Sequence, residues 1–189
     1  MFDLEQARYL INLIAQDSLS MLNELESSDT PEERKKSLGI NLEISNQAFQ
    51  KIVTSQGIKQ NKISVNDRVL IVDDARNMLN VMRAFVEDLG FGTVETASNG
   101  ADAWKMIQTQ GQYGLVISDW EMPKMDGLEL LKRVREDQTL SKLPFIIVSS
   151  TNQLNKVQLA IQAGVTDYMV KPLNQKLLAE KLRRYLEKA

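Results

Sequence analysis

Four short apolar runs of the sequence are each followed by polar side chains that could do chemistry together. These side chains are carboxylates, hydroxyls and one ammonium group, namely Asp73, Asp74, Asp119, Ser149, Ser150 and Lys171. Clustered carboxylates repel one another and favour a bound cation, and oxygen ligands without imidazole or thiolate suit Mg²⁺. A lysine opposite them could neutralise an added anion. The pattern predicts a metal-assisted phosphoryl site in which a carboxylate can be the acceptor.

Each of these residues also has an ordinary structural explanation when it is taken alone. Asp74 could cap a helix over residues 75–89, since aspartate is a preferred N-cap. A serine pair after a strand often belongs to a turn, and a lysine before a proline, here Lys171, often lies at the surface. The coincidence of these residue types after four apolar runs favours one shared site.

The composition excludes several classes of function. The 189-residue chain contains no Cys and no His, which excludes disulfides, thiolate or imidazole metal sites, and a histidine that carries a phosphoryl group. Histidine kinases and histidine phosphotransfer domains are therefore excluded. The formal net charge of −2 argues against non-specific nucleic-acid binding. The apolar runs reach four residues and the first residues are acidic, so we expect a cytoplasmic protein with no signal peptide or membrane span.

The elements that position the polar side chains follow from a regular alternation along the chain. Short apolar runs at residues 69–72, 94–97, 115–117, 145–148 and 168–170 are separated by amphipathic stretches of helical length. This alternation predicts an α/β domain with a five-stranded, doubly wound parallel sheet over residues 67–189. In such a sheet the functional crevice lies beyond the carboxyl ends of the strands, which is where the polar side chains fall.

The motifs of residues 68–188 resemble response-regulator receiver domains, and among these the chemotaxis-type single receiver. The matching stretches are VLIVDD (69–74), LVISDWEMPKMDGLELLK (115–132), LPFIIVSS (143–150) and QAGVTDYMVKP (162–172). The resemblance implies a flavodoxin-like fold and a two-component response regulator. Such a protein is phosphorylated by a histidine kinase or an acyl phosphate and then changes its interaction with a downstream protein target. It is not an enzyme beyond its own phosphorylation from phosphodonors and its own dephosphorylation.

The resemblance also implies roles for individual residues at the phosphoryl site. Asp119 matches the aspartate that accepts the phosphoryl group. The implied Mg²⁺ ligands are Asp73, Asp74, Asp119 and the backbone carbonyl of Glu121. Lys171 matches the lysine that pairs with the phosphoryl group, and it precedes an expected cis proline, Pro172.

Two further residues match the switch that transmits phosphorylation to the surface. Ser149 matches the hydroxyl that moves to bind the phosphoryl oxygen, and Tyr168 matches the aromatic side chain that turns inward as the hydroxyl moves. Ser150 departs from the family, which usually has Ala or Gly there, and could narrow access to the site. On or near the surface that reads out the switch we expect Val157, Tyr168 and Lys181.

Residues 1–57 lie outside this resemblance and predict a helical hairpin, which a linker at residues 58–66 joins to the receiver. Apolar residues at 3–4 spacing predict one helix from residue 3 to about residue 25. The start signal Thr30-Pro31-Glu32-Glu33 predicts a second helix that ends before Gly57. Two such helices cannot bury both apolar faces alone, so they pack on the rest of the chain or on a second copy. The near-heptad spacing of the first helix favours a homodimer.

Three functions compete for this hairpin. We favour an interaction module that dimerises the protein or docks a partner. A DNA-binding output has local support in Arg34-Lys35-Lys36, but residues 1–66 carry 7 basic and 9 acidic side chains, which argues against nucleic acid. The pair Glu43 and Asn46 resembles the acid and amide of some chemotaxis phosphatases that act on aspartyl phosphate, although two fixed positions often match by chance.

Overall fold

The structure is a computed structural model that describes residues 62–150, 154–173 and 175–186. The hairpin predicted for residues 1–57 and the linker residues 58–61 lie outside the described residues, so the hairpin and this part of the linker stay predictions.

Strands and helices alternate along the described chain. The strands are β1 (Arg68–Val72), β2 (Thr93–Ala97), β3 (Tyr113–Asp119), β4 (Phe145–Ser149) and β5 (Asp167–Val170). The helices are α3 (Arg76–Asp88), α4 (Gly100–Gln110), α5 (Gly127–Glu136), α6 (Leu154–Gln162) and α7 (Gln175–Tyr185). Within the described ranges, no helix has the length and apolar character to cross a membrane.

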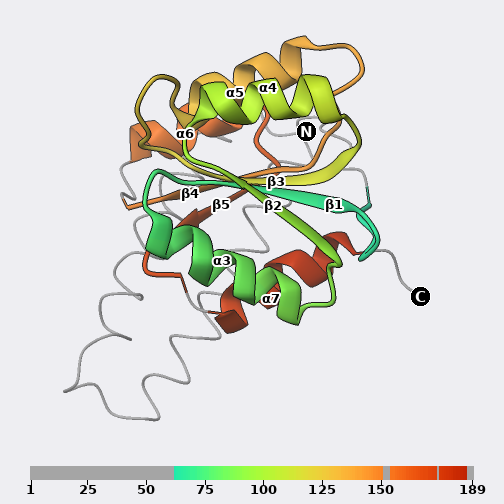
Figure 1. Cartoon of the computed structure of the whole chain (residues 1–189). Helices are drawn as coiled ribbons and strands as arrows, with labels where there is room; N and C mark the ends of the chain where they lie inside the picture. The colour runs from blue at the N-terminus through green and yellow to red at the C-terminus, as the bar shows by residue number, and fades with distance from the viewer. Residues whose placement is uncertain (1–61, 151–153, 174, 187–189) are drawn as a thin grey trace, which may run out of the picture. The chain divides into compact units, whose positions relative to one another are not determined.

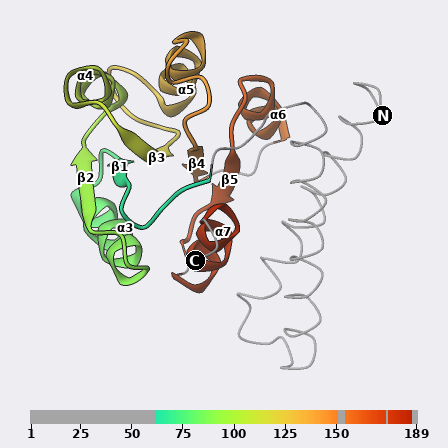
Figure 2. The same ribbon diagram turned by 90° about the vertical axis from the view of Figure 1, so that its right-hand side faces the viewer.

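The five strands form one parallel sheet in the order β2-β1-β3-β4-β5. Figures 1 and 2 show α3 and α7 on one face of this sheet and α4 and α5 on the other. Helices on both faces leave the central strands without solvent contact, which explains their continuous apolar runs. All of residues 69–72 in β1 and 145–148 in β4 are fully buried. The predicted five-stranded doubly wound α/β fold is therefore confirmed.

Side-chain caps start two of the helices and correct one prediction. Asn99 accepts a hydrogen bond from the N–H of residue 102 at the start of α4, and Asp126 accepts one from the N–H of residue 129 at the start of α5. At α3 the N-cap residue is Ala75, and Asp73 Oδ1 accepts its N–H at 2.8 Å. The suggestion that Asp74 caps this helix is therefore wrong, because the preceding aspartate makes the local turn and leaves the Asp74 side chain exposed.

The described end of the predicted linker packs on the domain. Ile63 is fully buried and belongs to the core beneath α3 and α7. Its N–H donates to the carbonyl of Tyr185 at 2.9 Å, and a parallel bridge pairs Ile63 with Leu186. Ile63 is thus held against the end of α7.

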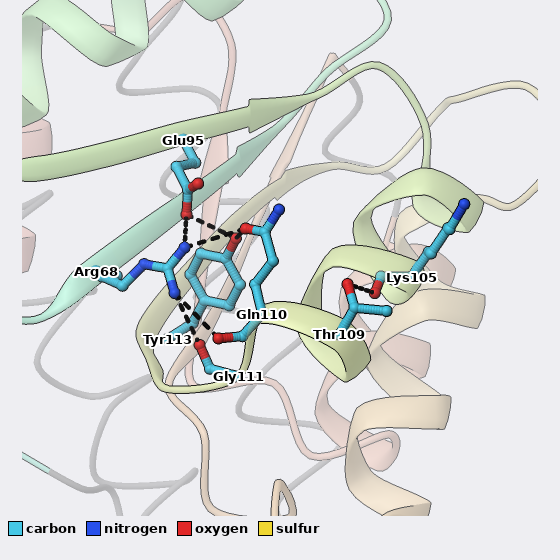
Figure 3. A network of polar contacts seen from close by, with 7 residues as sticks. All are labelled: Arg68, Glu95, Lys105, Thr109, Gln110, Gly111 and Tyr113. Atoms are coloured by element: carbon cyan, nitrogen blue, oxygen red, sulfur yellow. Dashed lines mark hydrogen bonds and ion pairs between the residues drawn. The ribbon is translucent and has the colours of Figure 1, made fainter.

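A polar network closes the end of the sheet where β1 and β3 begin (Figure 3). The Arg68 guanidinium lies 4.8 Å from the centre of the Tyr113 ring, forms an ion pair with Glu95, and donates to the carbonyls of Gln110 and Gly111 at 3.2 Å. The Tyr113 hydroxyl donates to Glu95 Oε2 at 2.7 Å. Burial, followed by the bond to Glu95, raises the pKa of Tyr113 well above its usual value of 10.0. This network ties β1, β2 and β3 together at the edge opposite the predicted site.

Candidate functional site

Three carboxylates converge at the carboxyl edge of the sheet. Asp73 and Asp74 directly follow β1, and Asp119 is the last residue of the neighbouring strand β3. One carboxylate oxygen from each residue lies within 4.8 Å of the other two. Asp73 is 0% exposed and Asp119 is 5% exposed, whereas Asp74 faces solvent. The structure therefore brings together the carboxylates that the sequence predicted for one site.

Lys171 supplies a cation to this cluster from the end of β5. Its Nζ lies 2.9 Å from Asp73 Oδ2 and 3.0 Å from Asp119 Oδ1. The peptide bond between Lys171 and Pro172 is cis, as the resemblance implied. Burial disfavours the charged lysine, but its hydrogen bonds to Asp73 and Asp119 outweigh burial and raise the pKa of Lys171. The ammonium group therefore stays charged at neutral pH.

Burial is the main influence on the pKa of Asp119. It raises the pKa of the Asp119 carboxyl, and the nearby charge of Asp73 adds to the increase, although the hydrogen bond and charge of Lys171 oppose it. The main chain at Gly127 lies close to that of Asp119, because a Cβ at Gly127 would stand 2.1 Å from the Asp119 carbonyl oxygen. The glycine thus lets the start of α5 approach the end of β3.

The donor set of this edge suits a hard divalent cation. Three carboxylates from two neighbouring strand ends supply oxygen ligands, one of them from an exposed residue that leaves an approach from solvent. Mg²⁺ prefers such oxygen ligands and usually keeps several waters. The Glu121 side chain is used differently, because its Oε2 accepts a hydrogen bond from Ser150 Oγ at 2.9 Å. The role of the Glu121 backbone carbonyl stays a prediction.

Ser149 and Tyr168 lie next to each other beside the carboxylates. Ser149 ends β4 and is fully buried, and Tyr168 in β5 is 8% exposed. Their side chains are hydrogen-bonded, and burial raises the pKa of Tyr168 while this bond opposes the rise. The rings of Tyr168 and Trp120 meet edge to face, with centroids 6.3 Å apart and an interplanar angle of 67°. The structure thus connects the residue after Asp119 to the predicted switch.

The structure differs from the sequence-based expectation at Lys181. Val157, Tyr168 and Lys181 were all expected on or near the readout surface, but they are 7%, 8% and 3% exposed. The Lys181 Nζ lies 2.7 Å from Asp167 Oδ1. The spacing of α7 contains a signal that could have revealed this, because Lys181 lies three residues after Leu178 and four before Tyr185, both of which are buried. The hydrogen bond between Glu121 and Ser150 had no comparable signal.

Comparisons with known proteins identify the family to which these features belong. Residues 69–183 match the response regulator receiver domain. The chain belongs to the response-regulator receiver family. Its receiver domain is 36% identical over 126 residues to the chemotaxis protein CheY-3 of Vibrio cholerae, a match that covers 67% of this chain and 96% of that protein. It is 35% identical over 115 residues to the chemotaxis protein CheY1 of Helicobacter pylori, covering 61% of this chain and 93% of that protein.

Solved structures of receivers share the same fold. The chemotaxis protein CheY4 of Vibrio cholerae is similar with a TM-score of 0.60 and 31% identity, over 64% of this chain and 99% of that one. The receiver domain of a sensor histidine kinase from Pseudomonas aeruginosa is similar with a TM-score of 0.58 and 24% identity, over 64% of this chain and 97% of that one. That structure carries a magnesium ion coordinated in its active-site cleft. The predicted resemblance to chemotaxis-type receivers is confirmed.

Proposed function

We propose that this receiver is a phosphorylation switch in which Asp119 accepts a phosphoryl group from a histidine kinase or a small acyl phosphate. The observation that carries the proposal is the convergence of Asp73, Asp74 and Asp119 within 4.8 Å, together with Lys171 at 3.0 Å from Asp119. Membership of the receiver family and similarity to chemotaxis proteins support the same function.

The chemistry follows from the charges at the strand ends. A deprotonated Asp119 oxygen attacks phosphorus, a new P–O bond forms, and the bond from phosphorus to the donor's leaving group breaks. Since burial raises the pKa of Asp119, the nucleophilic carboxylate is lost as the pH falls through that raised value. The Lys171 ammonium already lies 3.0 Å from Asp119 and can pair with an oxygen of the new phosphoryl group.

We assign a Mg²⁺ site to Asp73, Asp74 and Asp119, with the backbone carbonyl of Glu121 as a further oxygen ligand. The three carboxylates present the oxygen donors that this ion prefers, and a solved receiver of the same fold holds magnesium in its cleft. When bound, the ion neutralises the charge that develops on the transferring group. The exposed carboxylate of Asp74 lets the ion enter from solvent.

The phosphorylated state changes the side chains beside the site. Added phosphoryl oxygens attract the Ser149 hydroxyl. In the unmodified protein this hydroxyl is hydrogen-bonded to the Tyr168 side chain. Movement of the hydroxyl alters the surroundings of the Tyr168 ring, and two packings of similar energy exchange populations. A downstream protein target that prefers one packing would then bind according to phosphorylation.

The test of this function is labelling with acetyl phosphate. The wild-type protein should gain the mass of one phosphoryl group, and the label should be stable to acid and labile to alkali. The variant Asp119→Asn should gain none, whereas Asp126→Asn, a control at the start of α5, should label normally. Label that persists on Asp119→Asn would move the acceptor elsewhere. The protein is not proposed to catalyse any reaction other than its own phosphorylation and dephosphorylation.

For the amino-terminal residues we propose an assembly role, on the apolar spacing of the sequence alone. Leu4→Asp with Ile11→Asp should convert a homodimer to a monomer in light scattering of the full chain. A monomeric wild-type protein would refute the dimer, and an unchanged dimer in the variant would refute this interface.

A further inference from the structure

The main chain of Tyr168 is held by two charged side chains at one edge of the sheet, where β5 is the last of the described strands. Strand β5 pairs with β4 on one side, and alternate residues of a parallel edge strand turn their N–H and C=O groups away from the neighbouring strand. The N–H of Tyr168 donates to Asp167 Oδ1 at 2.8 Å, and its carbonyl accepts from Lys181 Nζ at 3.2 Å. These side chains occupy hydrogen-bonding positions that a further strand would use.

The two charges form a buried, hydrogen-bonded pair. Lys181 Nζ donates to Asp167 Oδ1 at 2.7 Å, and the two residues are 3% and 0% exposed. The second oxygen of Asp167 accepts from the Tyr185 hydroxyl at 2.9 Å. A buried charge persists in a protein when it is paired and its remaining hydrogen-bonding positions are filled. The cluster therefore joins α7 firmly to the main chain of β5.

We propose that Asp167 and Lys181 are positioning residues that fix the main chain of Tyr168 on α7, so that the change after phosphorylation is confined to the Tyr168 side chain. This inference rests on the proposed function, in which Tyr168 responds to the state of Asp119. The two ends of the residue are held differently. Its ring contacts Trp120 and Ser149 near the phosphoryl site, whereas its main chain is bound to charges on the α7 side. With the main chain fixed, a displaced Ser149 hydroxyl must be accommodated by rotation of the ring.

The matched variants are Lys181→Met and Tyr185→Phe. Lys181→Met removes the ammonium group that binds the Tyr168 carbonyl. Tyr185→Phe removes a hydrogen bond from the same Asp167 carboxylate, at similar burial, but leaves both main-chain bonds of Tyr168 in place. Lys181→Arg is the conservative rescue. The double variant Asp167→Asn, Lys181→Met avoids an unpaired buried carboxylate if the single variant does not fold.

Amide hydrogen exchange of the full-length protein measures directly how firmly the main chain of Tyr168 is held. After correction for global stability, the Tyr168 amide should exchange about tenfold faster in Lys181→Met than in Tyr185→Phe, because the Tyr168 carbonyl loses its charged donor and the main chain of this residue opens more readily. Lys181→Arg should restore slow exchange. Equal exchange at Tyr168 in the two variants would show that Lys181 stabilises the domain generally, and would overturn the proposal.

The response of the Tyr168 ring tests the consequence for signalling. Beryllofluoride serves as the phosphoryl mimic, and the ring is followed by its ¹³C resonances. The wild type and Tyr185→Phe should show the same shift on addition of beryllofluoride, and Lys181→Met should show less than half of it. An unchanged shift in Lys181→Met would overturn the proposal that Lys181 positions Tyr168. A wild type with no shift would overturn the proposed function instead, while the exchange measurement would still decide whether Lys181 holds Tyr168.

Discussion

Replacing Lys171 should lower the stability of the domain, and bound Mg²⁺ should restore part of that stability. The Lys171 Nζ stands 2.9 Å from a fully buried Asp73 oxygen and 3.0 Å from Asp119. At an effective dielectric constant of about 20, each contact is worth roughly 6 kcal/mol before the cost of desolvation is subtracted. Removing one partner of a buried ion pair typically costs about 3–5 kcal/mol, because the remaining charge is uncompensated. Lys171→Met should therefore lower the free energy of unfolding by about that amount in EDTA.

Mg²⁺ should recover more stability in Lys171→Met than in the wild type. In the variant the ion meets two buried carboxylates whose cation is missing, so it binds more tightly. An ion at 100 times its dissociation constant stabilises the folded state by about 2.7 kcal/mol. The assay is urea unfolding followed by circular dichroism, with EDTA or saturating Mg²⁺. The control is Lys132→Met, an exposed residue of α5, whose unfolding free energy should change by less than about 0.5 kcal/mol in either buffer.

Two results would refute this reasoning. A loss of less than about 1 kcal/mol in EDTA would mean that Lys171 does not compensate the buried carboxylates. An equal Mg²⁺-dependent gain in wild type and variant would mean that the ion does not bind at the same carboxylates as the lysine.

Three further predictions test the electrostatics and packing around this site and at the other end of the sheet. Asp119 binds its proton more tightly in the folded than in the unfolded state, so the free energy of unfolding in EDTA should fall as pH rises through the folded pKa, and Asp119→Asn should abolish this fall in a pH series of urea titrations. Gly127→Ala places a methyl group 2.1 Å from the Asp119 carbonyl oxygen and should cost about 1–3 kcal/mol, whereas Gly92→Ala, which meets nothing within 4 Å, should not lower the melting temperature. Absorbance at 295 nm should show that Tyr113→Phe removes a tyrosine that ionises well above its usual pKa of 10.0.

The sheet and the carboxylate cluster could be predicted from the sequence because both follow from local patterns and a general rule. Apolar runs such as residues 145–148 are long enough to identify buried strands, and parallel strands bring their carboxyl ends to one edge. This rule was sufficient to group Asp73, Asp119 and Lys171, although 98 residues separate the first from the last. It did not require the orientation of any helix.

The features that the sequence did not reveal depend on helix rotation and on contacts between loops. Whether Lys181 faces solvent or β5 depends on how α7 is rotated on the sheet. The buried apolar residues of α7 set this rotation, and it places Lys181 inside the domain in spite of its charge. The bond between Glu121 and Ser150 joins two loops that are 29 residues apart, and no periodic pattern encodes it. Ile63 lies in a polar stretch that reads as a linker, yet a single buried side chain and one main-chain bond attach it to α7.

The two lysines around β5 have opposite relations to the phosphoryl site. Lys171 pairs with the carboxylate that would be modified, so its surroundings change when charge is added to Asp119. Lys181 pairs with Asp167, a carboxylate that is fully buried and bound by three donors, so its surroundings should stay constant. Strand β5 thus has a constant ion pair at its start and, at its end, an ion pair that changes with the state of Asp119. A strand held in this way can transmit the change in charge through the side chain that lies between the two ion pairs. In β5 that side chain is Tyr168.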